Sequence, residues 1–91
     1  MIGFKRTMEW DRATLDKYDK MIKLMPLFHQ GIAEKVVNMK AEENARAHGG
    51  IVVQEEDVVR AFFAEVPKSF YDLMISAMDE AGFNHKRYMG K

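Results

Sequence analysis

Residues 25–59 read MPLFHQGIAEKVVNMKAEENARAHGGIVVQEEDVV, a stretch in which helix-forming runs alternate with residues that end helices. Pro26 disfavours helical geometry at the residue before it and can itself occupy the first turn of a helix. The Ala- and Glu-rich run from about Leu27 to His48 therefore predicts one long helix. Gly49 can adopt the left-handed conformation that caps this helix, and Gly50 releases the chain into a turn.

The residues after the paired glycines predict a short extended segment and a third helix. Ile51-Val52-Val53 is β-branched but too short for a sheet of its own. We expect it to pack on the helices as an extended strut, or to pair with its own copy across a dimer. The next helix begins at Gln54 or Glu55, where acidic residues favour the first turn. Pro67 ends this helix after Val66. Its buried side consists of Val58, Val59, Phe62 and Phe63.

A first helix is predicted upstream of Pro26, from Asp11 to about Met25. Asp11 is a suitable N-cap, because its carboxylate can accept hydrogen bonds from the unpaired N–H groups of the first turn. Residues 1–9 carry little pattern, so we expect a frayed lead-in there. The apolar positions recur at spacings of three and four, which places them on one helical face; they are Leu15, Tyr18, Ile22 and Met25.

A fourth helix is predicted downstream of Pro67, over residues 68–82. Ser69 can cap it, with Asp72 three residues later as an imperfect capping box. Gly82 ends the helix, and Phe83 is expected to pack back on it. Residues 83–91 are expected to form a basic, solvated tail. The apolar stripe consists of Phe70, Leu73, Met74, Ala77, Met78 and Ala81.

Together these elements predict one all-α domain over residues 1–91. It would be a compact bundle of about four helices with a short extended segment at Ile51–Val53. The long helix carries two apolar stripes side by side, which predicts burial on two sides, against neighbouring helices or another subunit. The first stripe consists of Phe28, Ile32, Val36 and Met39, and the second of Ala33, Val37, Ala41 and Ala45.

Composition and charge exclude several classes of protein. The 91 residues include 14 Lys and Arg and 14 Asp and Glu, so no net charge draws the chain toward nucleic acid or anionic lipid. The chain has no cysteine, which excludes disulfides, thiolate nucleophiles and Cys-bound zinc or iron–sulfur clusters. No window approaches the ~20 apolar residues of a membrane span, and residues 1–7 lack the apolar core of a signal peptide. We expect a cytoplasmic protein.

A series of residues between Met8 and about Phe63 matches the pattern of a known family. These residues are Trp10, Leu24-Met25-Pro26-Leu27-Phe28, Glu42-Glu43 with Ala45, Gly49-Gly50, Val52-Val53 and Glu55-Glu56-Asp57-Val58. With them, the core segment 10–63 resembles the PCP_red family, the small domain at the C-terminus of the B subunit of light-independent protochlorophyllide reductase. The family commonly has an arginine soon after the Pro-aromatic turn, where this chain has His29-Gln30-Gly31.

The resemblance implies an accessory domain of an oxidoreductase rather than a complete enzyme. In the full reductase, the iron–sulfur ligands and the catalytic carboxylate belong to larger domains, so we expect no cofactor in this chain. The implied partners are another protein, a second copy of the chain, or an apolar, tetrapyrrole-like ligand.

No catalytic or metal-binding arrangement is evident in the sequence. His29, His48 and His85 lack the spacing of metal-binding motifs. The acidic runs Glu42-Glu43 and Glu55–Asp57 are interpreted as a solvated helix face and a helix start, not as paired catalytic carboxylates. The candidate contacts for a ligand or partner are aromatic and turn residues, namely Trp10, Pro26, Phe28, His29, Phe62, Phe63 and Phe70.

Three functional hypotheses follow. The preferred one is a non-catalytic helical interaction module of the protochlorophyllide-reductase accessory type. The second is a histone-like helical dimer that binds nucleic acid, because a long helix, a short strut and a third helix resemble that fold; the zero net charge disfavours it. The third is an enzyme whose site is assembled across an oligomer from His29, His48 and carboxylates, and it ranks last.

Overall fold

The computed structural model describes residues 6–89, except for the side chains of Phe28 and Met89. Within these residues the predicted all-α class is confirmed, because helices dominate and the only sheet has two very short strands. The elements are β1 (Glu9–Trp10), α1 (Arg12–Lys23), α2 (Leu27–Ala47), β2 (Val52–Val53), α3 (Glu55–Glu65), the 3-10 helix η1 (Lys68–Phe70), α4 (Tyr71–Ala81) and α5 (His85–Met89).

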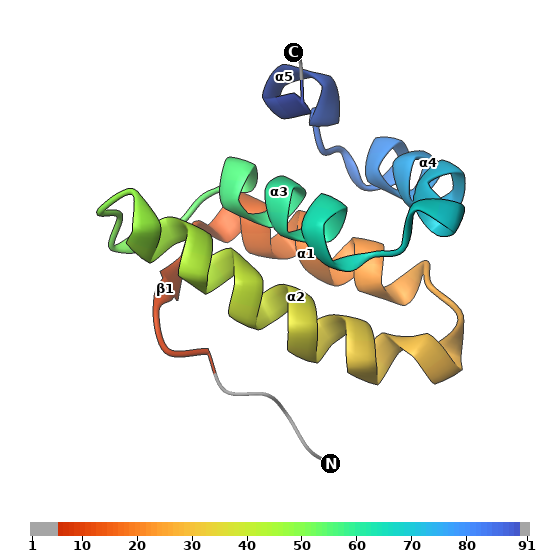
Figure 1. The fold of residues 1–91 in the computed structure, drawn as a ribbon, viewed down its shortest axis with the longest axis horizontal. Coiled ribbons are helices and arrows are strands. Elements are labelled where there is room, and N and C mark those ends of the chain that lie inside the picture. Colours follow the sequence, from red (N-terminus) through yellow and green to blue (C-terminus); the bar gives the residue numbers. More distant parts are fainter. Residues whose placement is uncertain (1–5, 90–91) are drawn as a thin grey trace.

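The helices pack around the long helix α2. Both α1 and α3 pack on α2, whereas α4 packs mainly against α1 and α5 mainly against α3. Figure 1 shows that α4 and α5 consequently lie on the opposite side of the bundle from α2. The arrangement leaves one face of α2 at the edge of the molecule.

The first helix begins as the sequence predicts. The Asp11 carboxylate accepts hydrogen bonds from the backbone N–H and the hydroxyl of Thr14, at 3.0 and 2.9 Å. The backbone N–H of Asp11 also donates to Val53 O at 2.9 Å. The N-cap of α1 is therefore held to the end of β2. Thr14, which the Asp11 carboxylate bonds, is buried.

Helix α2 ends at a glycine cap. Gly49 has a φ of 78°, its N–H donates to Arg46 O, and the N–H of Gly50 donates to Ala45 O. This pair of bonds is a Schellman motif, which the sequence predicts from the paired glycines. A Cβ on Gly50 would lie 3.0 Å from Cε1 of His48 and 3.2 Å from Ala45 O, so even an alanine there would require these neighbours to shift slightly.

The pairing of the extended segment differs from the sequence prediction. Val52–Val53 pairs in parallel with Glu9–Trp10 of the same chain, in the register Glu9 with Val52 and Trp10 with Val53. The segment therefore has a strand partner within its own chain, which the sequence analysis did not predict; its pairing with a second copy across a dimer stays a prediction. Residues 7–9 are also not a frayed lead-in, because β1 and the bonds of Thr7 order them; residues 1–5 lie outside the described residues.

Three aromatic rings run through the centre of the core. The buried Tyr18 ring lies between Trp10 and Phe62, with ring centroids 5.1 and 6.0 Å away. The Tyr18 hydroxyl donates to Glu34 O at 3.1 Å. Burial, assisted by the nearby Glu34 carboxylate, raises the pKa of Tyr18, which keeps this hydroxyl a donor. From α2, the core receives Val37, Ala41 and Ala45.

The start of the fourth helix was predicted wrongly. The segment after Pro67 first forms η1, and α4 begins only at Tyr71. Ser69 is exposed within η1 and is not the cap; the N-cap position is Phe70, without a side-chain hydrogen bond. Tyr71 anchors the helix instead, because its hydroxyl donates to Phe63 O at 2.6 Å.

The end of α4 agrees with the prediction, but the tail does not. Gly82 has a φ of 97° and Phe83 N–H donates to Met78 O, so the buried Phe83 packs back as expected. Residues 85–89 then form α5 rather than a solvated tail. His85 is buried and contacts Asp79 Oδ1 at 3.0 Å. The Glu55 carboxylate holds the start of α5 by accepting from Asn84 N–H at 2.8 Å.

Candidate interaction surface

The turn between α1 and α2 is ordered by backbone bonds and exposes apolar side chains. Leu24 and Met25 donate their N–H groups to Met21 O and Ile22 O, and His29 N–H donates to Pro26 O. Pro26 occupies the N-cap position, with φ −54° and ψ 140°. Leu27, the first residue of α2, is 81% exposed. The proline thus starts the helix at a point where the next side chain projects beyond the bundle.

The segment from η1 into α4 presents a second group of apolar side chains. Phe70 is 46% exposed, and Leu73, three residues later, is 69% exposed. The Phe70 ring meets the His29 ring edge to face, with centroids 6.2 Å apart. This contact brings the beginning of α2 and the beginning of α4 together, although they are about forty residues apart in the chain.

We define the turn surface as Leu24, Pro26, Leu27, His29, Phe70 and Leu73. These residues lie at the end of the molecule where the α1–α2 turn and the start of α4 meet (Figure 1). Apolar side chains exposed together, with charged neighbours at the margin, are typical of protein-binding sites. The margin here includes the exposed Lys23, Lys68 and Asp72.

The structure divides the contact residues predicted from the sequence into two groups. Pro26, His29 and Phe70 belong to the turn surface. Trp10 and Phe62 are buried in the core, and Phe63 is half-buried with its ring against Tyr71 at a centroid distance of 5.1 Å. The side chain of Phe28 lies outside the described residues. Sequence reasoning did not select the exposed Leu27 and Leu73, because a helical stripe does not show which of its residues a neighbour covers.

Two carboxylates are buried that the sequence analysis did not predict to be buried. The first is Glu42. Glu42 was expected on a solvated helix face, and this is corrected: it is buried, while Glu43 is exposed. Its carboxylate accepts from Thr7 N–H, from the Thr7 hydroxyl at 2.6 Å and from Trp10 Nε1 at 3.0 Å. Burial raises the pKa of Glu42, but these hydrogen bonds outweigh burial and lower it overall.

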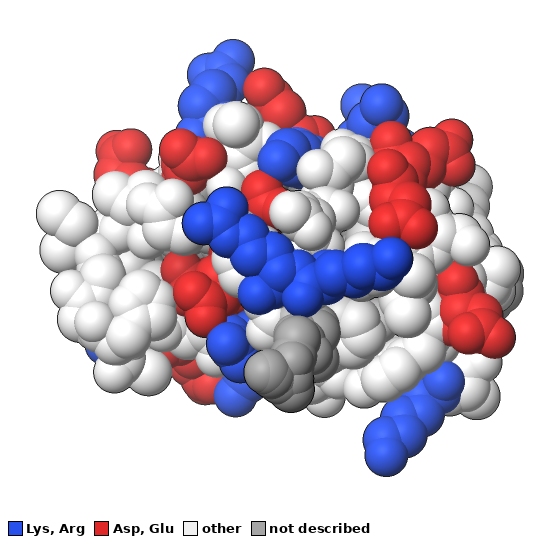
Figure 2. Space-filling model, turned by 90° about the horizontal axis from the view of Figure 1, so that it is seen from above, with Lys and Arg blue, Asp and Glu red and all other residues white. Residues whose placement is uncertain are grey.

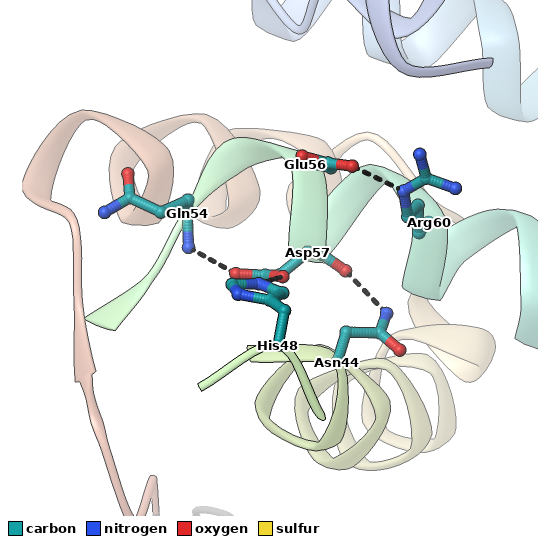
Figure 3. Close-up of polar contacts among 6 residues, drawn as sticks. All are labelled: Asn44, His48, Gln54, Glu56, Asp57 and Arg60. Atoms are coloured by element: carbon teal, nitrogen blue, oxygen red, sulfur yellow. Dashed lines mark hydrogen bonds and ion pairs between the residues drawn. The ribbon is translucent and has the colours of Figure 1, made fainter. Parts of the chain in front are cut away.

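The second buried carboxylate is Asp57 in the first turn of α3 (Figure 3). It accepts from Gln54 N–H at 2.9 Å and contacts His48 Nε2 at 2.8 Å, while the Asp57 carbonyl accepts from Asn44 Nδ2 at 3.0 Å. The hydrogen bond and the charge of Asp57 raise the pKa of His48. These contacts join the end of α2 to the start of α3. The predicted acidic helix start is confirmed, but the burial of Asp57 and its contact with His48 were not predicted.

The histidines do not assemble into one site. His29 lies against Phe70, His48 against Asp57 and His85 against Asp79. Within the described part of the chain, no group of three or more His, Cys, Asp or Glu side chains is placed to hold a metal ion. Each histidine instead connects two elements of the fold. His48 and His85 each pair with one carboxylate, whereas His29, which the enzyme hypothesis combines with His48, lies elsewhere against Phe70.

Charges are mixed on the face that carries α4 and α5. Figure 2 looks down on this face and shows acidic side chains on both sides of a short run of basic ones. Helix α5 carries the basic Lys86 and Arg87, and helix α4 carries the acidic Asp79 and Glu80. A continuous basic patch, the usual electrostatic feature of a nucleic-acid interface, does not form on this face.

Among residues 6–89, no helix has both the length and the apolar character needed to cross a bilayer. No family model matches the chain, and no curated protein or solved structure shows significant similarity to it.

Proposed function

We propose that this chain is a non-catalytic helical interaction module that docks a protein partner on the turn surface. The exposed cluster around the His29–Phe70 contact carries this proposal. Fully burying a leucine or phenylalanine side chain is worth about 1.5–3 kcal/mol. Leu27, Phe70 and Leu73 therefore offer a partner the kind of compact apolar centre that dominates binding energy at interfaces.

The position of the aromatic residues favours a protein over an enclosed apolar ligand. A flat ligand such as a tetrapyrrole would need aromatic walls, and Trp10 and Phe62 were the candidates. Both pack against Tyr18 in the core, so a ligand could reach them only by displacing core side chains. The apolar groups that are accessible lie on an outer surface instead, where a complementary protein face can cover them.

The resemblance to the PCP_red family suggests which partner to test first. An accessory domain of this type would associate with the subunits of a light-independent protochlorophyllide reductase. We propose that the turn surface makes this contact. The mixed charges on the face in Figure 2 favour protein association over the histone-like, nucleic-acid alternative, because binding to DNA depends on neutralising many phosphates.

The experiment compares two exposed apolar positions on the purified chain. Immobilised reductase subunits are titrated with the wild type, Leu73→Asp and Ile51→Asp. Leu73 belongs to the turn surface, whereas Ile51 is 82% exposed at the far end of α2. We expect Leu73→Asp to weaken binding at least about tenfold, the usual effect at an interface centre. Ile51→Asp should bind as the wild type does.

Two results would contradict the proposal. Equal binding by the wild type and Leu73→Asp would place the contact elsewhere. A wild type that binds no subunit, yet shifts the absorption spectrum of added protochlorophyllide, would replace docking with ligand binding.

A further inference from the structure

The outer face of α2 carries large apolar side chains that the other described residues, within 6–89, leave exposed. We define this face as Ile32, Lys35, Val36, Met39 and Glu43. Ile32 is 68% and Met39 59% exposed, and Val36 between them is half-buried. The predicted second stripe of α2, by contrast, packs in the core. One of the two sides that the sequence predicts to be buried is therefore covered by neighbouring helices, and no element within residues 6–89 covers the other.

The charges on this face are arranged along a ridge. Lys35, Met39 and Glu43 are four residues apart, so they form one of the i, i+4 rows that project from a helix surface. The row has a cation toward the N-terminus of α2, an apolar residue at its centre and an anion toward the C-terminus. In an antiparallel copy the row runs in the opposite direction, so the cation of each row faces the anion of the other on either side of Met39. The row is therefore complementary to its own antiparallel copy.

We propose that the outer face of α2 binds a second copy of this chain, antiparallel and about a two-fold axis at Met39. In the commonest class of helix packing, the i, i+4 ridges of two helices lie side by side at an angle of about −50°. An antiparallel copy then places Lys35 against the partner's Glu43 and Glu43 against the partner's Lys35. Met39 meets the partner's Met39, in the groove beside Ile32 and Val36. A parallel copy would bring like charges together.

The contact that Glu43 makes within its own chain does not prevent it from pairing with the second copy. Glu43 lies 3.5 Å from Lys40, and this exposed ion pair contributes little stability. The chain has no net charge, so two copies do not repel each other. Contact through one helix pair falls at the small end of specific interfaces, below about 1,200 Å². The dimer should therefore be weak and depend on concentration.

This dimer is independent of the proposed partner site. The outer face of α2 shares no residue with the turn surface. The dimer proposal can therefore fail while the partner-docking proposal holds, and the reverse. None of the substitutions that test the dimer alters the turn surface.

Sedimentation equilibrium tests the interface at its centre. Between about 10 µM and 1 mM, the range for an interface of this size, we expect the wild type to pass from monomer to dimer. Met39→Arg should weaken the dimer at least about tenfold, because it brings two like charges together on the axis. Ile51→Arg is the control at another exposed apolar position, away from the outer face of α2, and it should dimerise normally. A wild type that stays monomeric throughout overturns the proposal.

Charge exchange tests the antiparallel alignment. Lys35→Glu and Glu43→Lys should each weaken the dimer several-fold, and the double variant should recover most of the loss, because it restores both ion pairs in reversed order. A double variant that dimerises no better than the single variants overturns the alignment.

Cross-linking gives an independent measurement. The chain has no cysteine, so Met39→Cys introduces a single thiol at the proposed axis. It should form a disulfide-linked dimer under mild oxidation, because facing Cα atoms of closely packed helices lie within disulfide reach. Ser76→Cys, at an exposed position on α4, is the control. Equal cross-linking at both positions would contradict the proposed axis.

Discussion

His48 Nε2 lies 2.8 Å from Asp57 Oδ1, and this contact joins the last turn of α2 to the first turn of α3. The carboxylate is buried and the imidazole is exposed at the surface. Gly50 lies beside the same imidazole, close enough that a Cβ there would meet it at 3.0 Å. The junction therefore combines a backbone turn, a buried charge and a titrating group in one place.

The stabilisation that the His48–Asp57 contact gives the folded protein should decrease as pH rises. The folded-state pKa of His48 is raised, so its contribution is fully present below the unfolded pKa of about 6.5 and is lost as pH rises through the higher folded value. We expect the Tm difference between the wild type and His48→Gln to be larger at pH 5.5 than at pH 9. Thermal unfolding followed by circular dichroism measures it. For Glu80→Gln, at an exposed position of α4, the Tm difference from the wild type should be the same at both pH values.

Replacing Glu42 should destabilise the protein, whereas replacing its neighbour should not. Glu42→Ala leaves the Thr7 and Trp10 donors without their acceptor, a loss of about 1–3 kcal/mol in the free energy of unfolding. Glu43→Ala changes an exposed side chain and should stay within about 0.5 kcal/mol. Urea unfolding followed by Trp10 fluorescence measures both. Equal effects would show that the buried position of Glu42 does not matter.

The same carboxylate should contribute to acid unfolding. The folded-state pKa of Glu42 is lowered, so its stabilisation is present above the unfolded pKa of about 4.3 and is lost as pH falls through the folded value. The difference in unfolding free energy between the wild type and Glu42→Gln should therefore shrink as pH falls below about 4. A difference that stays constant down to pH 2 would contradict this account.

Two glycines should respond oppositely to alanine. Gly49 has a φ of 78°, a region that costs an L-residue roughly 1–2 kcal/mol, so Gly49→Ala should destabilise the protein. Gly31 lies inside α2 with open space around its Cβ position, so Gly31→Ala should stabilise it by roughly 0.5–1 kcal/mol. Chemical denaturation of both variants gives the comparison, and the same sign for both would refute it.

The two predicted helix caps should differ in strength. Asp11→Ala removes the bonds to Thr14 and should cost about 0.5–2 kcal/mol. Ser69 lies exposed in η1 and caps no helix, so Ser69→Ala should change the unfolding free energy by less than about 0.5 kcal/mol. A large loss at Ser69 would support the cap predicted from the sequence and contradict the observed start of α4.

Sequence patterns located most helix ends, because these depend on a few neighbouring residues. Pro26, the glycine caps at Gly49 and Gly82, and the N-cap at Asp11 act through backbone geometry within one turn of the helix. Ser69 shows the limit of such reasoning. A residue suited to capping has no effect if the chain enters a 3-10 helix there, and the bond from Tyr71 to Phe63 O contributes to that choice.

The sequence by itself determined an all-α chain, the order of its four longer helices and most of the residues that end them, since each of these is a short-range property. Only the tertiary structure decided which side chains of a helix are covered. Glu42 is buried because Thr7 and Trp10, more than thirty residues earlier, reach its carboxylate. Ile32 and Met39 are exposed because α1 and α3 pack on the other side of α2. Periodicity marks both faces as apolar, but only the packing of distant segments selects the one that stays exposed.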